Sequence, residues 1–412
     1  MSASRILVVT GGFPVRSETF IRDHVTGLLD AGADVTVLAL HDGDGSAWDE
    51  DELRLGLSGR VRRARIDAPL RHRLVRMPAR FVAHASCALG PAWRMVTPSQ
   101  GWRGPSGVLL AAASALGAAG VPHQFDRIHA EFGPSGVVAA KLRRAGFIAG
   151  PLSCAFYGYD ATRAIMQSGP GLYRELFEDA DLVLPNSEFL AQKLRQAGAP
   201  TSKVIVHRLG VRTDRFVPAV RPAPQPGPWR ATAIGRFVPK KGFATLLHAL
   251  ARAGEAAPEL TLIGDGPMSG ELRALAASLG LQRSVRFSGW LGREDVLAHL
   301  ASTDALIAPS ETAEDGDIEG MPVVVMEAMA SGVPIIGTDH SGIPEIVRDG
   351  VNGVIVPERD SAGLARAMLR LSDPGLRRAC GAQSRAIAVS ELDHAMLMRR
   401  MIGLLFRQPV AS

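Results

Sequence analysis

Short apolar runs alternate with helix-length amphipathic segments along the whole chain. This alternation is typical of β-α-β units that build a parallel sheet. In the first half the pattern predicts strands at Arg5–Thr10, Asp34–Leu40, Asp126–His129, Leu152–Phe156, Asp181–Leu184 and Lys203–His207. In the second half it predicts strands at Ala231–Gly235, Glu259–Ile263, Val285–Phe287, Ala305–Pro309, Val333–Gly337 and Gly353–Val356.

A proline-rich segment separates these two halves. It carries five prolines between Val217 and Trp229, and nothing else in the 412 residues looks as much like a domain boundary. A chain of this length is also too long for one typical core. We therefore expect an N-terminal Rossmann-like domain at 1–217, a linker at 218–229 and a second Rossmann-like domain from 230.

Composition describes an ordinary globular protein, with 46% hydrophobic and 21% charged residues. Three cysteines, Cys87, Cys154 and Cys380, match no metal-ligand spacing and fit a reducing cytoplasm. The first predicted strand follows Ser4 directly, so we expect no signal peptide. The least polar stretch, Gly107–Val121, is too short to span a bilayer and predicts a buried helix.

Positive charge is concentrated in the first half. Residues 1–220 carry 26 Lys+Arg against 20 Asp+Glu, and nine arginines fall between Arg54 and Arg80 against one acid, Asp67. One interpretation is a solvated arginine-rich helical face. The other is weak docking on anionic lipid head groups or on a phosphate-bearing acceptor, which would place the protein at the inner face of the membrane. Nucleic acid is not expected, because no aromatic residues are interleaved with the charges.

The segment from Glu319 to Gly332 is the most informative in the chain. Pro322 suits the first turn of a helix and predicts one from Pro322 to Ala330. Glu319 then lies in the preceding loop, and Glu327 lies on the helix. The first helical N–H groups favour a phosphate, and two carboxylates beside them favour sugar hydroxyls. A nucleotide sugar is the obvious ligand.

A second loop adds cations to this picture. Gly235-Arg-Phe-Val-Pro-Lys-Lys-Gly242 joins a predicted strand to a helix, and Arg236 and Lys241 there suit a diphosphate. Taken alone, the loop also fits a solvated basic turn. Both loops follow the carboxyl ends of predicted strands, where open parallel sheets bind their ligands.

These residues resemble a known family. The loops at 235–242 and 319–332, together with Gly264-Asp-Gly-Pro267, Thr338-Asp-His-Ser-Gly-Ile-Pro-Glu345 and Gly353-Val-Ile-Val-Pro-Glu358, resemble retaining glycosyltransferases of family 4. Looser matches in the first half resemble the branch that builds bacterial exopolysaccharides: Gly11-Gly-Phe-Pro14, Ser17-Glu-Thr-Phe-Ile21, Ile128–Gly133 and Phe156–Asp160. The resemblance implies the GT-B architecture of two Rossmann-like domains, with the last residues, 394–412, crossing back as a helix from the C-terminal domain, 230–393.

The resemblance also implies roles. Arg236 and Lys241 would neutralise the diphosphate leaving group, Glu319 would face the transferred sugar, and Glu327 would accept hydrogen bonds from the ribose. Gly11 and Gly12 would let the N-terminal backbone approach the donor. The remaining donor-site candidates are Gly235, Gly264, Gly266, Phe287, Ser310, Gly320, Met321, Pro322 and Val323.

One position departs from the family pattern. Members often carry His-x-His before the cleft, whereas this chain reads His129-Ala-Glu131. Glu131 is therefore a candidate sugar ligand, acceptor-positioning group or nucleophile, beside the front-face reaction usually proposed for the family. The other acceptor-side candidates are Ser17, Glu18, His129, Tyr157 and Asp160.

No metal and no cofactor are expected. Asp315-Gly-Asp-Ile-Glu-Gly320 begins like a calcium loop, but position 12 is Met326 and Pro322 redirects the chain. The expected activity is retaining transfer of a hexosyl unit from a nucleotide diphosphate sugar, UDP before GDP, to a lipid-linked saccharide. The same chemistry on a soluble aminocyclitol or antibiotic precursor, a nucleotide-sugar epimerase and a non-catalytic partner protein remain alternatives.

Overall fold

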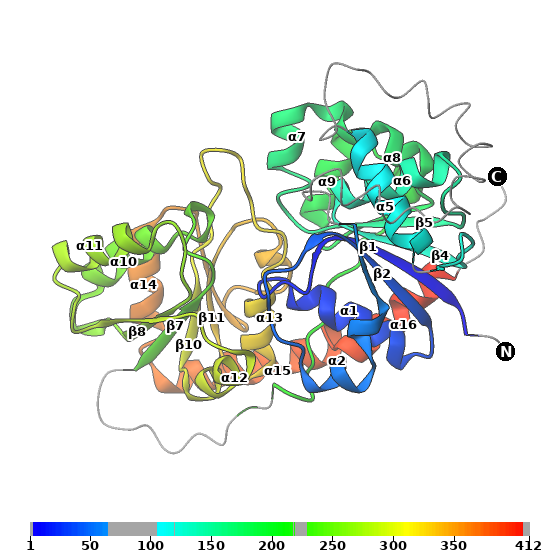
Figure 1. Ribbon diagram of the computed structural model, residues 1–412. Helices are drawn as coiled ribbons and strands as arrows, with labels where there is room; N and C mark the ends of the chain where they lie inside the picture. The colour runs from blue at the N-terminus through cyan, green and yellow to red at the C-terminus, as the bar shows by residue number, and fades with distance from the viewer. Residues whose placement is uncertain (1–2, 65–104, 119, 217, 219–228, 407–412) are drawn as a thin grey trace.

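The computed structural model describes residues 3–64, 105–118, 120–216, 218 and 229–406, which form two α/β halves (Figure 1). The first half is built on a six-stranded sheet whose neighbouring strands are all parallel. The strand order is β3-β2-β1-β4-β5-β6. The strands are β1 (Arg5–Phe13), β2 (Asp34–Asp42), β3 (Val61–Arg63), β4 (Arg127–Glu131), β5 (Leu152–Phe156) and β6 (Leu182–Pro185).

Alternating residues of this sheet build two separate cores, because successive strand side chains point to opposite faces. Leu7 and Val9 of β1 pack with the helices of one face, and Ile6 and Val8 pack with α1 (Thr19–Asp30) on the other. The helices of the first face are α5 (Pro105–Ala118), α6 (Gly133–Arg144), α8 (Arg174–Asp179) and α9 (Glu188–Gln196). Two short helices, α2 (Glu50–Arg54) and α7 (Arg163–Ser168), lie in the connections.

The second half repeats the same construction. Its parallel sheet has the order β12-β11-β10-β7-β8-β9. The strands are β7 (Arg230–Ile234), β8 (Glu259–Ile263), β9 (Val285–Gly289), β10 (Ala305–Ala308), β11 (Ile335–Thr338) and β12 (Gly353–Val356). One face is covered by α10 (Phe243–Ala253), α11 (Ser269–Ser278) and α14 (Ser361–Arg370), the other by α12 (Arg293–Ser302), α13 (Val323–Ala330) and α15 (Pro374–Glu391).

The last described helix, α16 (His394–Leu405), packs on the first half of the chain (Figure 1). Its Met398 and Met401 share a core with α1, and Gly27 of α1 leaves the space that Met398 fills. The backbone fixes the entry to this helix, because the Val211 N–H donates to Leu392 and the His394 N–H donates to Val211. The second face of the N-terminal sheet is thus completed by the end of the chain.

The predicted strands are confirmed to within a few residues at their ends, with two differences. Lys203–His207 is not a strand, because only Ile205 and His207 donate to β6 carbonyls and the pairing goes no further. A short strand, β3, was not predicted, because three residues with two arginines lack the apolar pattern. The helix predicted from Pro322 begins at Val323, with Pro322 as its N-cap, and the buried helix predicted at Gly107–Val121 is α5.

The arginine-rich segment is not one helical face where it is described. Arg54 ends α2, Arg60 lies in a 3-10 turn, and Arg62 and Arg63 lie in β3. Residues 65–80 and most of the proline-rich segment lie outside the described residues. Among the residues that are described, no helix has the length and apolar character needed to cross a membrane.

Candidate active site

A cleft of about 870 Å³ opens between the two halves and is lined by both. Loops at the carboxyl ends of the strands form it, as expected for open parallel sheets. Twelve of the predicted site residues line it: Ser17, Glu18, Tyr157, Gly235, Arg236, Lys241, Glu319, Gly320, Met321, Pro322, Val323 and Glu327. The others lie outside this lining: Gly11, Gly12, His129, Glu131, Asp160, Gly264, Gly266, Phe287 and Ser310.

The first strand was predicted to end at Thr10, with Gly11 and Gly12 just after it, and this strand end is wrong. Strand β1 runs on to Phe13, and Gly12 is in register with His41 of β2. The apolar run had suggested an end at Thr10, but parallel pairing with β2 continues through both glycines. The cleft is approached instead by the segment that follows, from Arg16 to Phe20.

Glu319 is held by two lysines. Lys241 donates to one carboxylate oxygen at 3.0 Å, and Lys240 lies 3.3 Å from the other. Burial alone would raise the pKa of Glu319, but Lys241 and Lys240 outweigh it and lower the pKa to about 2. Lys240 was not among the predicted residues, although it adjoins Lys241. A 3-10 turn at Pro239–Lys241 directs both lysines to the same carboxylate.

A series of hydrogen bonds through His340 fixes the backbone of Glu319. The Glu319 N–H donates to His340 Nε2 at 3.0 Å, so His340 Nδ1 carries the proton and donates to Glu358 at 2.6 Å. Glu358 also accepts from the backbone N–H of Thr312 at 2.7 Å. His340 is fully buried. The motifs at 338–345 and 353–358 thus support the loop that carries Glu319.

Glu327 faces the cleft from α13 beside an ion pair that joins the two halves. Arg293, at the start of α12, contacts both carboxylate oxygens of Asp23 in α1 at 3.1 and 3.0 Å. Burial raises the pKa of Glu327 to about 7, with Arg293 opposing the rise and Asp23 adding to it. Arg293 and Asp23 could not be predicted, because 270 residues separate them.

The two halves also meet through bare backbone beside Glu319. A Cβ placed on Gly320 would overlap the carbonyl oxygen of Tyr157. A Cβ on Gly158 would lie 2.9 Å from the carbonyl oxygen of Ile318. Glycine at both positions therefore permits the loop after β5 to touch the loop that carries Glu319.

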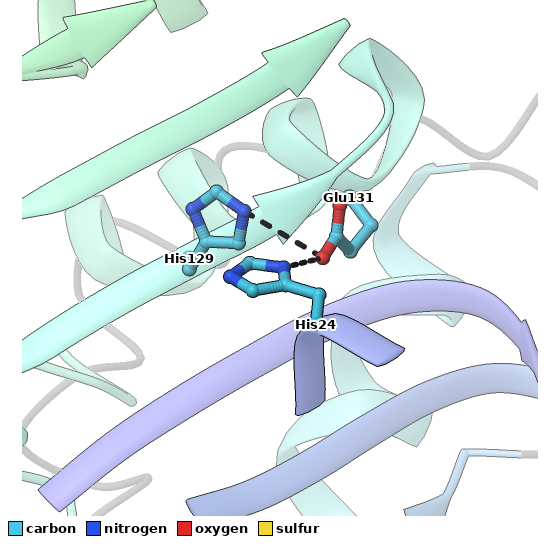
Figure 2. A group of neighbouring side chains, drawn as sticks. All are labelled: His24, His129 and Glu131. Atoms are coloured by element: carbon cyan, nitrogen blue, oxygen red, sulfur yellow. Dashed lines mark hydrogen bonds and ion pairs between the residues drawn. The ribbon is translucent and has the colours of Figure 1, made fainter. Parts of the chain in front are cut away.

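Glu131 lies beneath the wall of the cleft, with its side chain fully buried. His24 Nδ1 lies 2.5 Å from Oε1, and His129 Nε2 lies 3.6 Å from the same oxygen (Figure 2). The Tyr157 hydroxyl donates to Oε2. Burial would raise the pKa of Glu131, but His24 and His129 hold it well below its ordinary value. The carboxylate is therefore an internally satisfied anion.

Two imidazoles and a carboxylate are also a ligand set that zinc uses, and all three come within 4.8 Å of one another. Ligand atoms around one tetrahedral zinc ion lie roughly 3.3 Å apart. The 2.5 Å separation of His24 and Glu131 is a hydrogen-bond distance, not a ligand–ligand distance. We therefore describe His24 and Glu131 as a hydrogen-bonded pair, with His129 as an electrostatic neighbour of the same carboxylate.

Two family models match the chain, one in each half. The "Glycosyl transferase 4-like domain" covers residues 17–210, and "Glycosyl transferases group 1" covers residues 221–386. The colanic acid biosynthesis glycosyltransferase WcaL of Escherichia coli K12 is 34% identical over 87% of this chain and 88% of its own length. The amylovoran biosynthesis glycosyltransferase AmsK of Erwinia amylovora is 32% identical over 89% and 90%.

The chain belongs to glycosyltransferase family 4. It is a retaining glycosyltransferase of a family that generally works without a metal ion. The crystal structure of HepE from Anabaena with UDP and glucose covers 98% of this chain and 99% of its own at a TM-score of 0.71. Its sequence is 20% identical, so the likeness concerns the fold, which is GT-B.

Proposed function

We propose that this family 4 glycosyltransferase moves a hexosyl unit from a UDP-sugar to a hydroxyl of a lipid-linked saccharide in exopolysaccharide assembly. The observation that carries the donor part is Glu319, an ionised carboxylate held between Lys240 and Lys241 in the cleft. The pathway is supported by the two relatives, whose names place them in colanic acid and amylovoran synthesis. HepE, crystallised with UDP and glucose, supports uridine over guanosine, which stays second.

In this proposal the cations act on the diphosphate. Arg236 is exposed in the cleft, and Lys241 reaches it from the neighbouring 3-10 turn. Both gain interaction energy as negative charge develops on the departing diphosphate, which is how such groups lower a barrier. The leaving phosphate then takes the acceptor proton in a front-face reaction that retains the configuration.

The carboxylates bind hydroxyls. Glu319 stays ionised because of its lysines, so it accepts hydrogen bonds from the transferred sugar. Glu327 does the same for the ribose. Glu131 is buried against His24 and Tyr157, so in this proposal it positions the wall of the cleft rather than attacking the sugar.

Thermal melting with UDP-, GDP-, ADP- and dTDP-hexoses tests the donor, because specific binding to the folded state raises the melting temperature. We expect the largest rise with a UDP-hexose. Chromatography of the same incubations with lipid-linked saccharides then separates transfer from simple epimerisation. An epimerised donor without transfer would indicate an epimerase, and no stabilisation by any nucleotide sugar would indicate a non-catalytic partner.

A further inference from the structure

The N-terminal wall of the cleft is a continuous group of aromatic rings. Phe20 comes from α1, Phe132 from the turn between β4 and α6, and Tyr157 and Tyr159 from the loop after β5, and all four line the cleft. Ring centroids are 4.6 Å apart for Phe20 and Tyr157, 5.0 Å for Phe132 and Tyr157, and 5.6 Å for Phe132 and Tyr159. We call these four residues the aromatic wall.

Phe132 adopts an unfavourable backbone conformation in this wall. Its φ of 70° and ψ of 145° belong to a region that only glycine adopts readily. A non-glycine residue stays there only where the surroundings determine it, and such positions cluster at functional sites. Glycine would relieve the strain but would remove the ring from the cleft.

One buried carboxylate fixes the loops of the wall. Asp160 Oδ2 accepts from the Gly133 N–H at 3.0 Å, directly after Phe132. Its Oδ1 accepts from the Tyr157 and Gly158 N–H groups at 3.1 and 3.0 Å. Asp160 is fully buried, so its role is to hold Phe132 and Tyr157 in place.

The wall adjoins the groups that face the donor. The loop carrying Tyr157 and Tyr159 touches the loop carrying Glu319 through Gly158 and Gly320, with no side chain between them. A ring lying on the wall would therefore be next to the transferred sugar. Tyr159 is 41% exposed, so the wall is open to an incoming molecule.

Glu18 borders the wall and lines the same cleft. It stands at the N-cap of α1, yet its side chain makes no capping hydrogen bond. Burial raises the pKa of Glu18 to about 7, and Glu131 and Asp44 add to the rise. Glu18 precedes Phe20 by two residues at the start of α1, and both residues line the cleft.

We propose that the aromatic wall and Glu18 form the acceptor site, in which the apolar C–H face of a neutral sugar ring stacks on the rings and Glu18 hydrogen-bonds a hydroxyl. The proposal rests on the proposed function and deepens it. The electron-rich ring faces attract the C–H groups of a pyranose, and the flanking carboxyl group meets its polar edge. The acceptor end in this proposal is a neutral saccharide, and an amine, which aromatic rings and a carboxylate can also bind, is the competing outcome of the test.

Saturation-transfer NMR tests this on the full-length protein with UDP bound, using methyl β-galactopyranoside, methyl α-mannopyranoside and streptamine as probes. We expect saturation of a saccharide's C–H face, and a loss of binding of about threefold to tenfold in Tyr159→Ala, Phe132→Ala and Phe132→Gly. Glu18→Gln should also weaken binding of the saccharide. Phe189→Ala, an aromatic truncation outside the cleft lining, should leave it unchanged.

The two Phe132 variants separate function from folding. Glycine normally destabilises a protein relative to alanine, but at this φ the order should reverse, so Phe132→Gly should melt above Phe132→Ala. Both should lose the saccharide signal equally, because neither has the ring. The opposite melting order would overturn the role assigned to the strain.

Binding that ignores the wall variants, no saccharide signal on the wild-type protein, or preference for streptamine would each overturn the acceptor site. Calorimetry with the UDP-hexose on the same samples tests the proposed function separately. Normal donor binding together with any of these outcomes would remove this proposal alone. Absent donor binding would remove the proposed function.

Discussion

The two walls of the cleft handle charge in opposite ways. On the C-terminal wall, Lys240, Lys241 and Arg236 line the cleft, and the carboxylate of Glu319 pairs with the two lysines. On the N-terminal wall, Glu131 is buried and satisfied by its neighbours, and aromatic rings line the cleft there together with Glu18. Cations already in place suit the proposed diphosphate, whereas aromatic rings beside one carboxyl group suit the neutral sugar ring proposed as acceptor.

The largest expected effect is on the charged wall. Arg236→Ala or Lys241→Ala should lower turnover about 10²-fold or more, comparable with removing one donor from an oxyanion hole. Initial rates at saturating donor measure it. Arg366→Ala, an exposed arginine of α14, is the matched control and should keep full activity. Near-normal turnover in both cleft variants would contradict the assignment of the diphosphate site.

The next largest effect is expected at the contact between Gly320 and the Tyr157 carbonyl, where the two walls meet. In Gly320→Ala the new Cβ overlaps the Tyr157 carbonyl, so the halves must separate. We expect turnover to fall by about tenfold to a hundredfold, because small displacements of reacting groups are costly. Small-angle scattering with UDP should show a less compact protein. Gly270→Ala, with open space around its Cβ, should change neither quantity. A compact and active Gly320→Ala would show that this contact is dispensable.

These two walls also differ in how far sequence could predict them. Glu319, Glu327 and Lys241 were found because they stand in contiguous motifs with a turn residue that sets their direction. Arg293 and Asp23 form their pair across the two halves, and no local pattern signals it. The burial of Glu131 depends on His24, contributed by α1, so its exposure could not be read from the strand motif at 127–131.

Ionised Glu327 should lower the stability of the fold while it contributes to donor binding. Its folded pKa of about 7 is raised, so the ionised group destabilises the fold above its ordinary pKa of 4.5. Glu327→Gln should therefore stabilise the protein by about 1–3 kcal/mol at pH 8, with the gain shrinking between pH 7 and 4.5. Donor affinity should fall about tenfold through lost ribose hydrogen bonds. Denaturant titrations at several pH values and calorimetry measure both. A Glu327→Gln variant that is less stable than wild type at pH 8 would contradict the raised pKa of Glu327.

Glu131 should affect turnover less and stability in the opposite sense. Its folded pKa is lowered, so the ionised group stabilises the fold above the ordinary pKa, and this is lost as pH falls. Glu131→Gln should melt lower than wild type at pH 8, with the difference narrowing towards acid pH. Turnover should fall less than about tenfold, because the group positions others and does not attack. Loss beyond about 10³-fold, with a glycosylated enzyme seen by mass spectrometry, would instead identify a nucleophile.

The smallest expected effect is that of chelation. In the proposed donor site the diphosphate meets Arg236 and Lys241 beside a second lysine, so a divalent ion would add charge where cations already line the cleft. Activity should therefore persist in excess EDTA. The buried cluster of His24, His129 and Glu131 needs a separate measurement, because EDTA reaches a buried ion slowly. Metal content should therefore be measured by mass spectrometry on the same samples. Activity lost and restored by Mg²⁺ or Mn²⁺ would show that the charged wall is incomplete. Stoichiometric zinc in the wild-type protein that is lost in His129→Gln would show that His24, His129 and Glu131 hold an ion. The metal, and not the histidines alone, would then balance the buried charge of Glu131.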